Sequence, residues 1–153
     1  MRTRVSAVVL TGVAALLTTT ALTGIGSAAQ AKDRPCGRPV STSGTTALGT
    51  TWTLKSMYDD DGPAAHPLVA GEEFEINTQV AGQHWAVTFS DNGTIFFNNP
   101  DDVSTPTGIR EVHPNPVNRG QSNHMAVHAV RSDGAEVIDA AVDLAPPPPR
   151  CAA

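Results

Sequence analysis

The stretch HWAVTFSDNGTIFFN, residues 84–98, contains two alternating apolar runs separated by the dipeptide Asn92-Gly93. In the first run Trp85, Val87 and Phe89 alternate with small or polar residues, which is the period of a half-buried strand. Asn-Gly tolerates the positive φ angles of a type I′ turn. We therefore predict that these residues form a tight β-hairpin.

The same period of two recurs on both sides of this hairpin. Upstream, Trp52 and Leu54 share one face of residues 50–57. The polar stretch 99–107 shows no apolar alternation, and residues 108–112 are predicted as a short strand. Residues 113–116 are predicted as a loop, because they contain two prolines. Asp133-Gly134 predicts a second tight hairpin. The remaining predicted inward sets are Phe74, Ile76, Thr78 and Val80; then Met125, Val127 and Ala129; then Ile138, Ala140, Val142 and Leu144.

About seven short strands are therefore expected within ~100 residues. No window of a dozen residues after the N-terminal leader keeps a helical period. The fold class predicted is all-β, an immunoglobulin-like β-sandwich, and a tryptophan on the third strand (Trp85) suits that topology.

The N-terminus has the layout of a secretory signal peptide, with Arg2 and Arg4 before an apolar run and Ala29-Gln30-Ala31 at its end. A transmembrane anchor is the alternative, but threonines dilute the run and it is shorter than the ~20 residues that span a bilayer. We predict a signal peptide over residues 1–31 that is cleaved after export by the general secretory route, giving a secreted, extracellular product.

Three segments are expected after the signal peptide: an irregular lead-in at 32–49, the sandwich domain at 50–145, and a polyproline tail with Cys151 at 146–153. Two of the 10 Lys and Arg residues lie in the leader, so 8 remain against 15 acidic residues, a net charge of −7. This charge disfavours nucleic acid and anionic membrane surfaces as partners. A monomer with no membrane span is expected.

The chain contains two cysteines, Cys36 and Cys151, near the two ends of the expected mature chain. In an oxidising compartment such a pair predicts a disulfide, which would close a loop of ~115 residues. An intermolecular bridge and two thiols are the alternatives. The polyproline run before Cys151 is interpreted as a rigid spacer.

Several strand and turn motifs resemble one group of proteins. They are GEEFEINT at 71–78, GQHWAV at 82–87, DNG at 91–93 and FF at 96–97. Together they resemble small secreted immunoglobulin-like proteins of actinobacteria, over about residues 52–144. That resemblance implies a sandwich fold and an extracellular location; because no activity is assigned to the group, it implies no functional residue.

Two sets of residues are candidate metal ligands. Asp59-Asp60-Asp61-Gly62 resembles the start of a calcium loop, without the full EF-hand pattern, and Asp101 and Asp102 could join it from another strand. His124 and His128 would share one strand face about 13 Å apart, which is too far for both to bind one ion. A site would therefore need His84 or His113 brought in from a neighbouring element. The simpler interpretations are hydrated turns and surface histidines, and no cofactor is predicted.

No catalytic motif is present: the sequence lacks a G-x-S-x-G elbow and an H-E-x-x-H pair. Asn92-Gly93-Thr94 matches the triplet for N-glycosylation, but the predicted hairpin turn also explains the presence of these residues. We expect a non-catalytic binding or cell-envelope accessory module for an unknown protein or envelope ligand, presented by residues 58–68, 98–107 and 113–122. The alternatives are a metal-binding (Ca, or Cu/Zn) extracellular domain and, beyond that, a small secreted enzyme or protease inhibitor.

Overall fold

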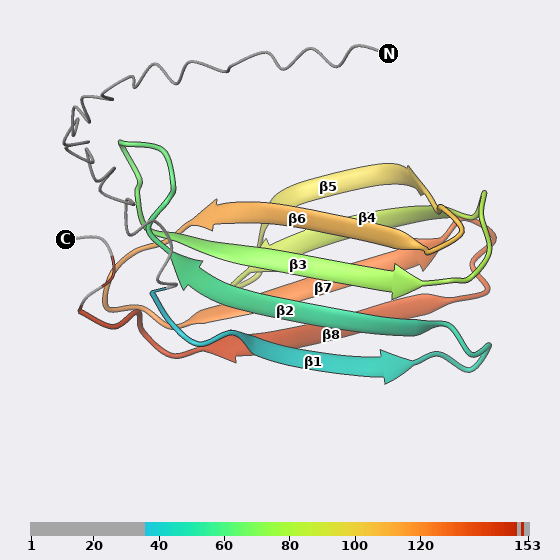
Figure 1. Cartoon of the computed structure of the whole chain (residues 1–153), viewed down its shortest axis with the longest axis horizontal. Coiled ribbons are helices and arrows are strands. Elements are labelled where there is room, and N and C mark those ends of the chain that lie inside the picture. The colour runs from blue at the N-terminus through green and yellow to red at the C-terminus, as the bar shows by residue number, and fades with distance from the viewer. Residues whose placement is uncertain (1–35, 150, 152–153) are drawn as a thin grey trace, which may run out of the picture. The chain divides into compact units, whose positions relative to one another are not determined.

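The computed structural model describes residues 36–149 and Cys151, so the predicted signal peptide, residues 1–31, lies outside the described part. The described residues form eight strands and no helix (Figure 1). Within them, accordingly, no helix has the length and hydropathy to cross a membrane. The strands are β1 (Val40–Thr45), β2 (Thr51–Asp59), β3 (Val69–Asn77), β4 (His84–Asp91), β5 (Thr94–Val103), β6 (Ile109–Pro116), β7 (Asn123–Arg131) and β8 (Val137–Leu144).

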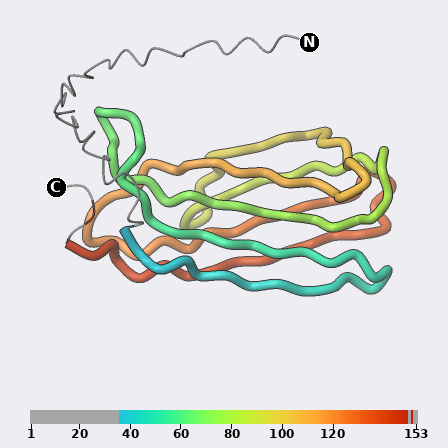
Figure 2. The backbone as a smooth tube through the Cα atoms, viewed as in Figure 1, coloured from blue at the N-terminus to red at the C-terminus, as the bar shows by residue number. Residues whose placement is uncertain are grey.

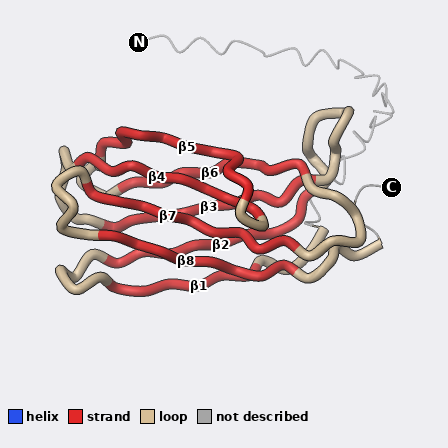
Figure 3. The backbone as a smooth tube through the Cα atoms, turned by 180° about the vertical axis from the view of Figure 1, so that it is seen from behind, coloured by secondary structure: helices blue, strands red, loops and turns tan. Residues whose placement is uncertain are grey.

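The strands are arranged in two antiparallel sheets of four, in the orders β1-β2-β3-β6 and β5-β4-β7-β8. The views from the front and from behind show one sheet covering the other (Figures 1 and 3). An all-β fold with the layers of a sandwich is therefore confirmed. β5 and β6 are the edge strands on one side of the sandwich, and β1 and β8 are the edge strands on the other.

The period-two pattern correctly predicted most of the core. Trp85, Val87 and Phe89 are completely buried, and Phe74 packs edge-on against Phe89 with 6.5 Å between ring centroids. The predicted inward residues of β2, β7 and β8 also contribute to the same core cluster. Burial of such side chains, at about 1.5–3 kcal/mol each, supplies the main favourable free energy of folding.

The Asn92-Gly93 hairpin is confirmed, with φ angles of 48° and 81° in its turn. The second connection is longer than predicted, because β7 ends at Arg131 and β8 begins at Val137. The predicted inward positions Thr78 and Val80 are wrong. β3 ends at Asn77, Gln79 adopts a positive φ of 53°, and Val80 is 52% exposed.

The expectation of an irregular lead-in is wrong for Val40–Thr45, which form β1. This strand has little apolar content because its side chains are mostly exposed. Its backbone pairs in register with β2, from Val40 opposite Ser56 to Thr45 opposite Thr51. Main-chain hydrogen bonding to β2 therefore defines this strand, and such bonding leaves no apolar periodicity in the sequence.

The prediction that Pro114 and Pro116 make residues 113–116 a loop is wrong. Residues 113–116 continue β6, and Pro100 lies within β5. Both are edge strands, where one side of the backbone has no neighbour, so a missing N–H costs no ladder hydrogen bond. Consequently β6 extends far enough to bring Asn115 opposite Ala70 of β3.

One end of the sandwich gathers several connections. The loop 60–68, green in Figure 2, and the loop 117–122 lie at this end, joined by a hydrogen bond from the Val117 amide to the Leu68 carbonyl. The Asn92-Gly93 turn lies here too, because the Asn92 amide donates to the His124 carbonyl. We call this the Asn92 end of the sandwich.

Candidate functional site

A pocket of about 310 Å³ opens at the Asn92 end. Three segments form its walls: the β4–β5 hairpin, the end of β6 with the loop that follows, and the first residue of β7. Most of its lining residues carry hydrogen-bonding side chains. The described lining residues are Asp91, Asn92, Thr94, Phe96, Asn115, Pro116, Val117, Asn118, Gln121 and Asn123.

The hairpin turn fixes one wall of the pocket. The Asn92 side chain accepts a hydrogen bond from the His124 amide (3.2 Å) and donates one to the Ser122 carbonyl (3.2 Å). The same residue therefore shapes the turn by its positive φ and joins the hairpin to the start of β7.

Two further amides are fixed deeper in the pocket. Asn115 donates to Asp91 Oδ2 (2.9 Å), which joins the two sheets across the open side of the sandwich. Asn123 is buried and donates to the Tyr58 hydroxyl (2.7 Å), which in turn donates to the Ala145 carbonyl (2.9 Å). These bonds hold both amides in place without a ligand.

The amides of Asn118 and Gln121 differ from these. Both side chains are exposed, and no hydrogen bond joins either of them to another described residue. The pocket therefore combines fixed polar groups at its base with two amides that are available at its rim.

Two carboxyl groups lie at this end of the core. Glu72 of β3 is fully buried, and neither of its oxygens has a hydrogen-bond partner among the described residues. Burial, reinforced by the negative charge of Asp91, raises the pKa of Glu72 from 4.5 to about 8. Burial also raises the pKa of Asp91, against the Asn115 hydrogen bond and the charge of His124. Glu72 is thus held as a neutral acid at neutral pH.

The structure does not bring the predicted calcium ligands together. Asp59 ends β2 at the Asn92 end, and Asp60 and Asp61 are exposed in the following loop. Asp101 and Asp102 pair with the start of β4, at the opposite end of the sandwich. Among residues 36–149 and Cys151, no three His, Cys, Asp or Glu side chains are grouped as a metal site would require.

His124 and His128 both project from the exposed face of β7, as predicted for a strand. Each lies opposite an aspartate of β8, with Nδ1–Oδ1 distances of 2.7 Å to Asp143 and to Asp139. The other two proposed histidines lie elsewhere: His84 contacts Asp101, and His113 stacks on Phe97. The structure therefore places the histidines in separate cross-strand contacts.

Cys36 and Cys151 are adjacent and buried, with Cys151 Sγ 3.0 Å from the Cys36 carbonyl oxygen. No disulfide joins them in this structure. The proline run delivers Cys151 to this position, with its amide bonded to the Pro148 carbonyl. The two cysteines therefore lie next to each other, and the disulfide between them stays a prediction.

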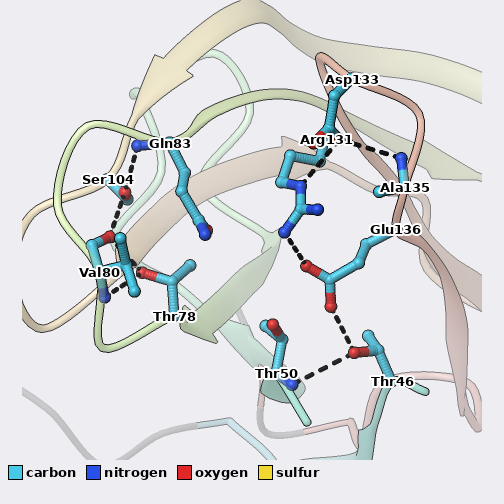
Figure 4. Close-up of polar contacts among 10 residues, drawn as sticks. All are labelled: Thr46, Thr50, Thr78, Val80, Gln83, Ser104, Arg131, Asp133, Ala135 and Glu136. Carbon is cyan, nitrogen blue, oxygen red and sulfur yellow. Dashed lines mark hydrogen bonds and ion pairs between the residues drawn. The ribbon is translucent and has the colours of Figure 1, made fainter. Parts of the chain in front are cut away.

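The far end of the sandwich is closed by a structural network (Figure 4). Arg131 donates to the buried Glu136 (2.6 Å) and to Asp133 (2.8 Å), and Thr46 donates to the other Glu136 oxygen. Ser104 likewise binds the Val80 carbonyl and the Gln83 amide. Most of these polar groups therefore bond to one another, while Gln83 Oε1 is buried without a hydrogen-bond partner among the described residues.

Two larger hollows differ from this pocket in their lining. One, of about 490 Å³, adjoins the Thr105–Gly108 turn at the far end and includes the charged side chains of Glu75, Asp102 and Arg110. The other, of about 670 Å³, is lined largely by small residues on the outer face of the sheet β5-β4-β7-β8. The Asn92-end pocket differs because amides from three segments converge in it.

Sequence reasoning named the loop 113–122 but missed Asp91 and Glu72. Extending the alternation of Phe74 and Ile76 back by two residues would place Glu72 inside the sandwich. The run NPVNRGQSN at 115–123 contains four of the five pocket amides, and that density is a signal in the sequence itself. The approach of Asp91 to Asn115 is a contact between sheets and leaves no local pattern.

Comparison with known proteins gave no match to a family model, a curated protein or a solved structure.

Proposed function

We propose that this protein is an exported, non-catalytic binding module of the cell envelope that holds its ligand in the Asn92-end pocket. The observation that carries the proposal is the convergence of five amide side chains and one carboxylate from three separate segments. Small-ligand sites commonly combine a concave surface with a few convergent polar groups.

Export is supported by the leader at residues 1–31. The immunoglobulin-like assignment is supported by the two antiparallel sheets, by the buried Trp85 and by the resemblance of residues 52–144 to secreted actinobacterial proteins. In such sandwiches the loops at one end present ligands, which is the position of this pocket.

A binding role rather than catalysis is favoured by the chemistry of the pocket. General acid–base catalysis uses a titratable group that can reach the substrate, commonly with a second group that orients or complements it. Asp91 is the one acidic residue among the described lining residues, and its partner is the neutral amide of Asn115. Glu72 has a suitable pKa but is fully buried and does not line the pocket, so it does not reach a bound ligand.

The test is co-sedimentation of the mature protein with purified actinobacterial cell walls. We compare the native chain with the double variant N118A/Q121A, which removes the two exposed rim amides. N77A is the matched control, because Asn77 is an exposed amide at the far end. The proposal predicts saturable binding that N118A/Q121A weakens and N77A does not. Absence of saturable binding, or equal binding by all three proteins, would contradict it.

A further inference from the structure

The composition of the pocket restricts the chemistry of its ligand. None of the described lining residues is Lys, Arg or His, so the lining itself offers an anionic ligand no cationic partner; the nearby Arg119 and His124 lie outside it. The apolar lining is confined to Phe96, Pro116 and Val117, which is little surface for a lipid chain. A neutral ligand rich in hydrogen-bonding groups fits this lining better.

Amide side chains suit hydroxyl groups in particular. An amide offers both a donor and an acceptor in one plane, and a hydroxyl both donates and accepts. Asn118 and Gln121 present such amides at the rim without bonds to other described residues. Neighbouring hydroxyls on one molecule can therefore bind one amide through its oxygen and its nitrogen together.

The base of the pocket supplies a fixed carboxyl group and an apolar surface. One oxygen of Asp91 accepts a hydrogen bond from Asn115, and the other is buried without a hydrogen-bond partner among the described residues, so Asp91 orders the base of the pocket. Phe96 is positioned by Phe89, with 6.0 Å between ring centroids, and contributes an aromatic surface to the lining. Sugar rings combine hydroxyls at their edges with C–H groups on their faces, and both parts have counterparts here.

We propose that the pocket binds a saccharide through vicinal hydroxyl groups. A volume of about 310 Å³ lies at the lower end of the range for small-molecule sites, which suits a sugar unit of a larger envelope polysaccharide. This inference rests on the proposed function and specifies its ligand. A protein or peptide ligand of the envelope is the competing outcome.

The experiment uses the same cell walls in three preparations: untreated, digested with protease, and oxidised with periodate, which cleaves vicinal diols. The inference predicts that binding survives protease digestion and is lost after periodate oxidation. N118A/Q121A should weaken binding to the digested walls by at least about tenfold, the expected effect of losing two ligand hydrogen bonds, while N77A binds as the native protein does.

The outcomes separate the two proposals. Binding that is lost after protease digestion and survives periodate oxidation would overturn the saccharide inference and leave a protein-binding module. Binding that survives both treatments would also overturn it, because no diol would be required. If the untreated walls do not bind, the proposed function itself fails.

Discussion

Replacing the buried Glu72 by glutamine should make the protein more stable at alkaline pH. The substitution keeps the size of the side chain and removes its ability to ionise. Burial and the charge of Asp91 raise the pKa of Glu72 to about 8 in the folded protein, against 4.5 for an exposed glutamate. The folded state thus binds a proton more tightly than the unfolded chain does.

The sign and size of the effect follow from this difference. Between pH 4.5 and 8 the folded protein retains a proton that the unfolded chain releases, so stability falls as pH rises. The contribution of Glu72 is complete below pH 4.5 and is lost as pH rises through 8. At 1.36 kcal/mol per pKa unit, the full loss is about 5 kcal/mol. E72Q should match the native protein at pH 5 within about 1 kcal/mol and exceed it by several kcal/mol at pH 9.

The assay is urea unfolding at pH 5 to 9, followed by the fluorescence of the buried Trp85 and of Trp52. The two cysteines are kept in one redox state throughout. E75Q is the control, because Glu75 lies on the same strand with its side chain 52% exposed; its difference from the native protein should not vary with pH. A constant difference between E72Q and the native protein across this range would refute the burial of an orphaned carboxyl at this position.

Three further predictions concern the rest of the fold. In G108A, the new Cβ would collide with the Ile76 carbonyl, and Gly108 has a φ of +112°, so the free energy of unfolding should fall by about 3 kcal/mol or more. In G120A, the new Cβ would meet only open space, so the free energy of unfolding should fall by about 1 kcal/mol in the same urea titration. Y58F removes the hydroxyl that accepts from the buried Asn123 and should cost about 1–3 kcal/mol; an unchanged urea midpoint would show that this hydroxyl does not hold Asn123. If Cys36 and Cys151 form a disulfide across 115 residues, reductant should lower the stability of the oxidised protein by about 4–5 kcal/mol and leave C36S/C151S unaffected; mass spectrometry that finds both cysteines alkylated without reductant would contradict the pairing.

The sequence predicted well those features that repeat along a strand. Alternating burial placed Trp85 and Phe89 in the core, and Asn92-Gly93 identified the hairpin, because both follow from local geometry. Strand β1 escaped prediction because backbone pairing with β2 defines it. Pro114 and Pro116 led to the wrong prediction of a loop in β6, because prolines are tolerated in edge strands.

The pocket was only partly accessible from the sequence. The loop containing Asn118 and Gln121 could be named as a ligand-presenting segment because of its polar, turn-rich composition. Its partners could not, because Asp91 meets Asn115 only when two sheets pack together. Glu72 shows the same limit: alternation could place it inside, but the absence of a bonding partner depends on every neighbouring strand.

The most direct test of the account is to map the ligand on the folded protein by NMR, using oligosaccharides released from protease-treated cell walls. We predict that the side-chain amide signals of Asn115, Asn118, Gln121 and Asn123 shift on addition of the oligosaccharides, and that those of Asn77 do not. Shifts confined to the outer face of the sheet β5-β4-β7-β8, or no shifts at saturating concentrations, would contradict the assignment of the Asn92-end pocket as the ligand site.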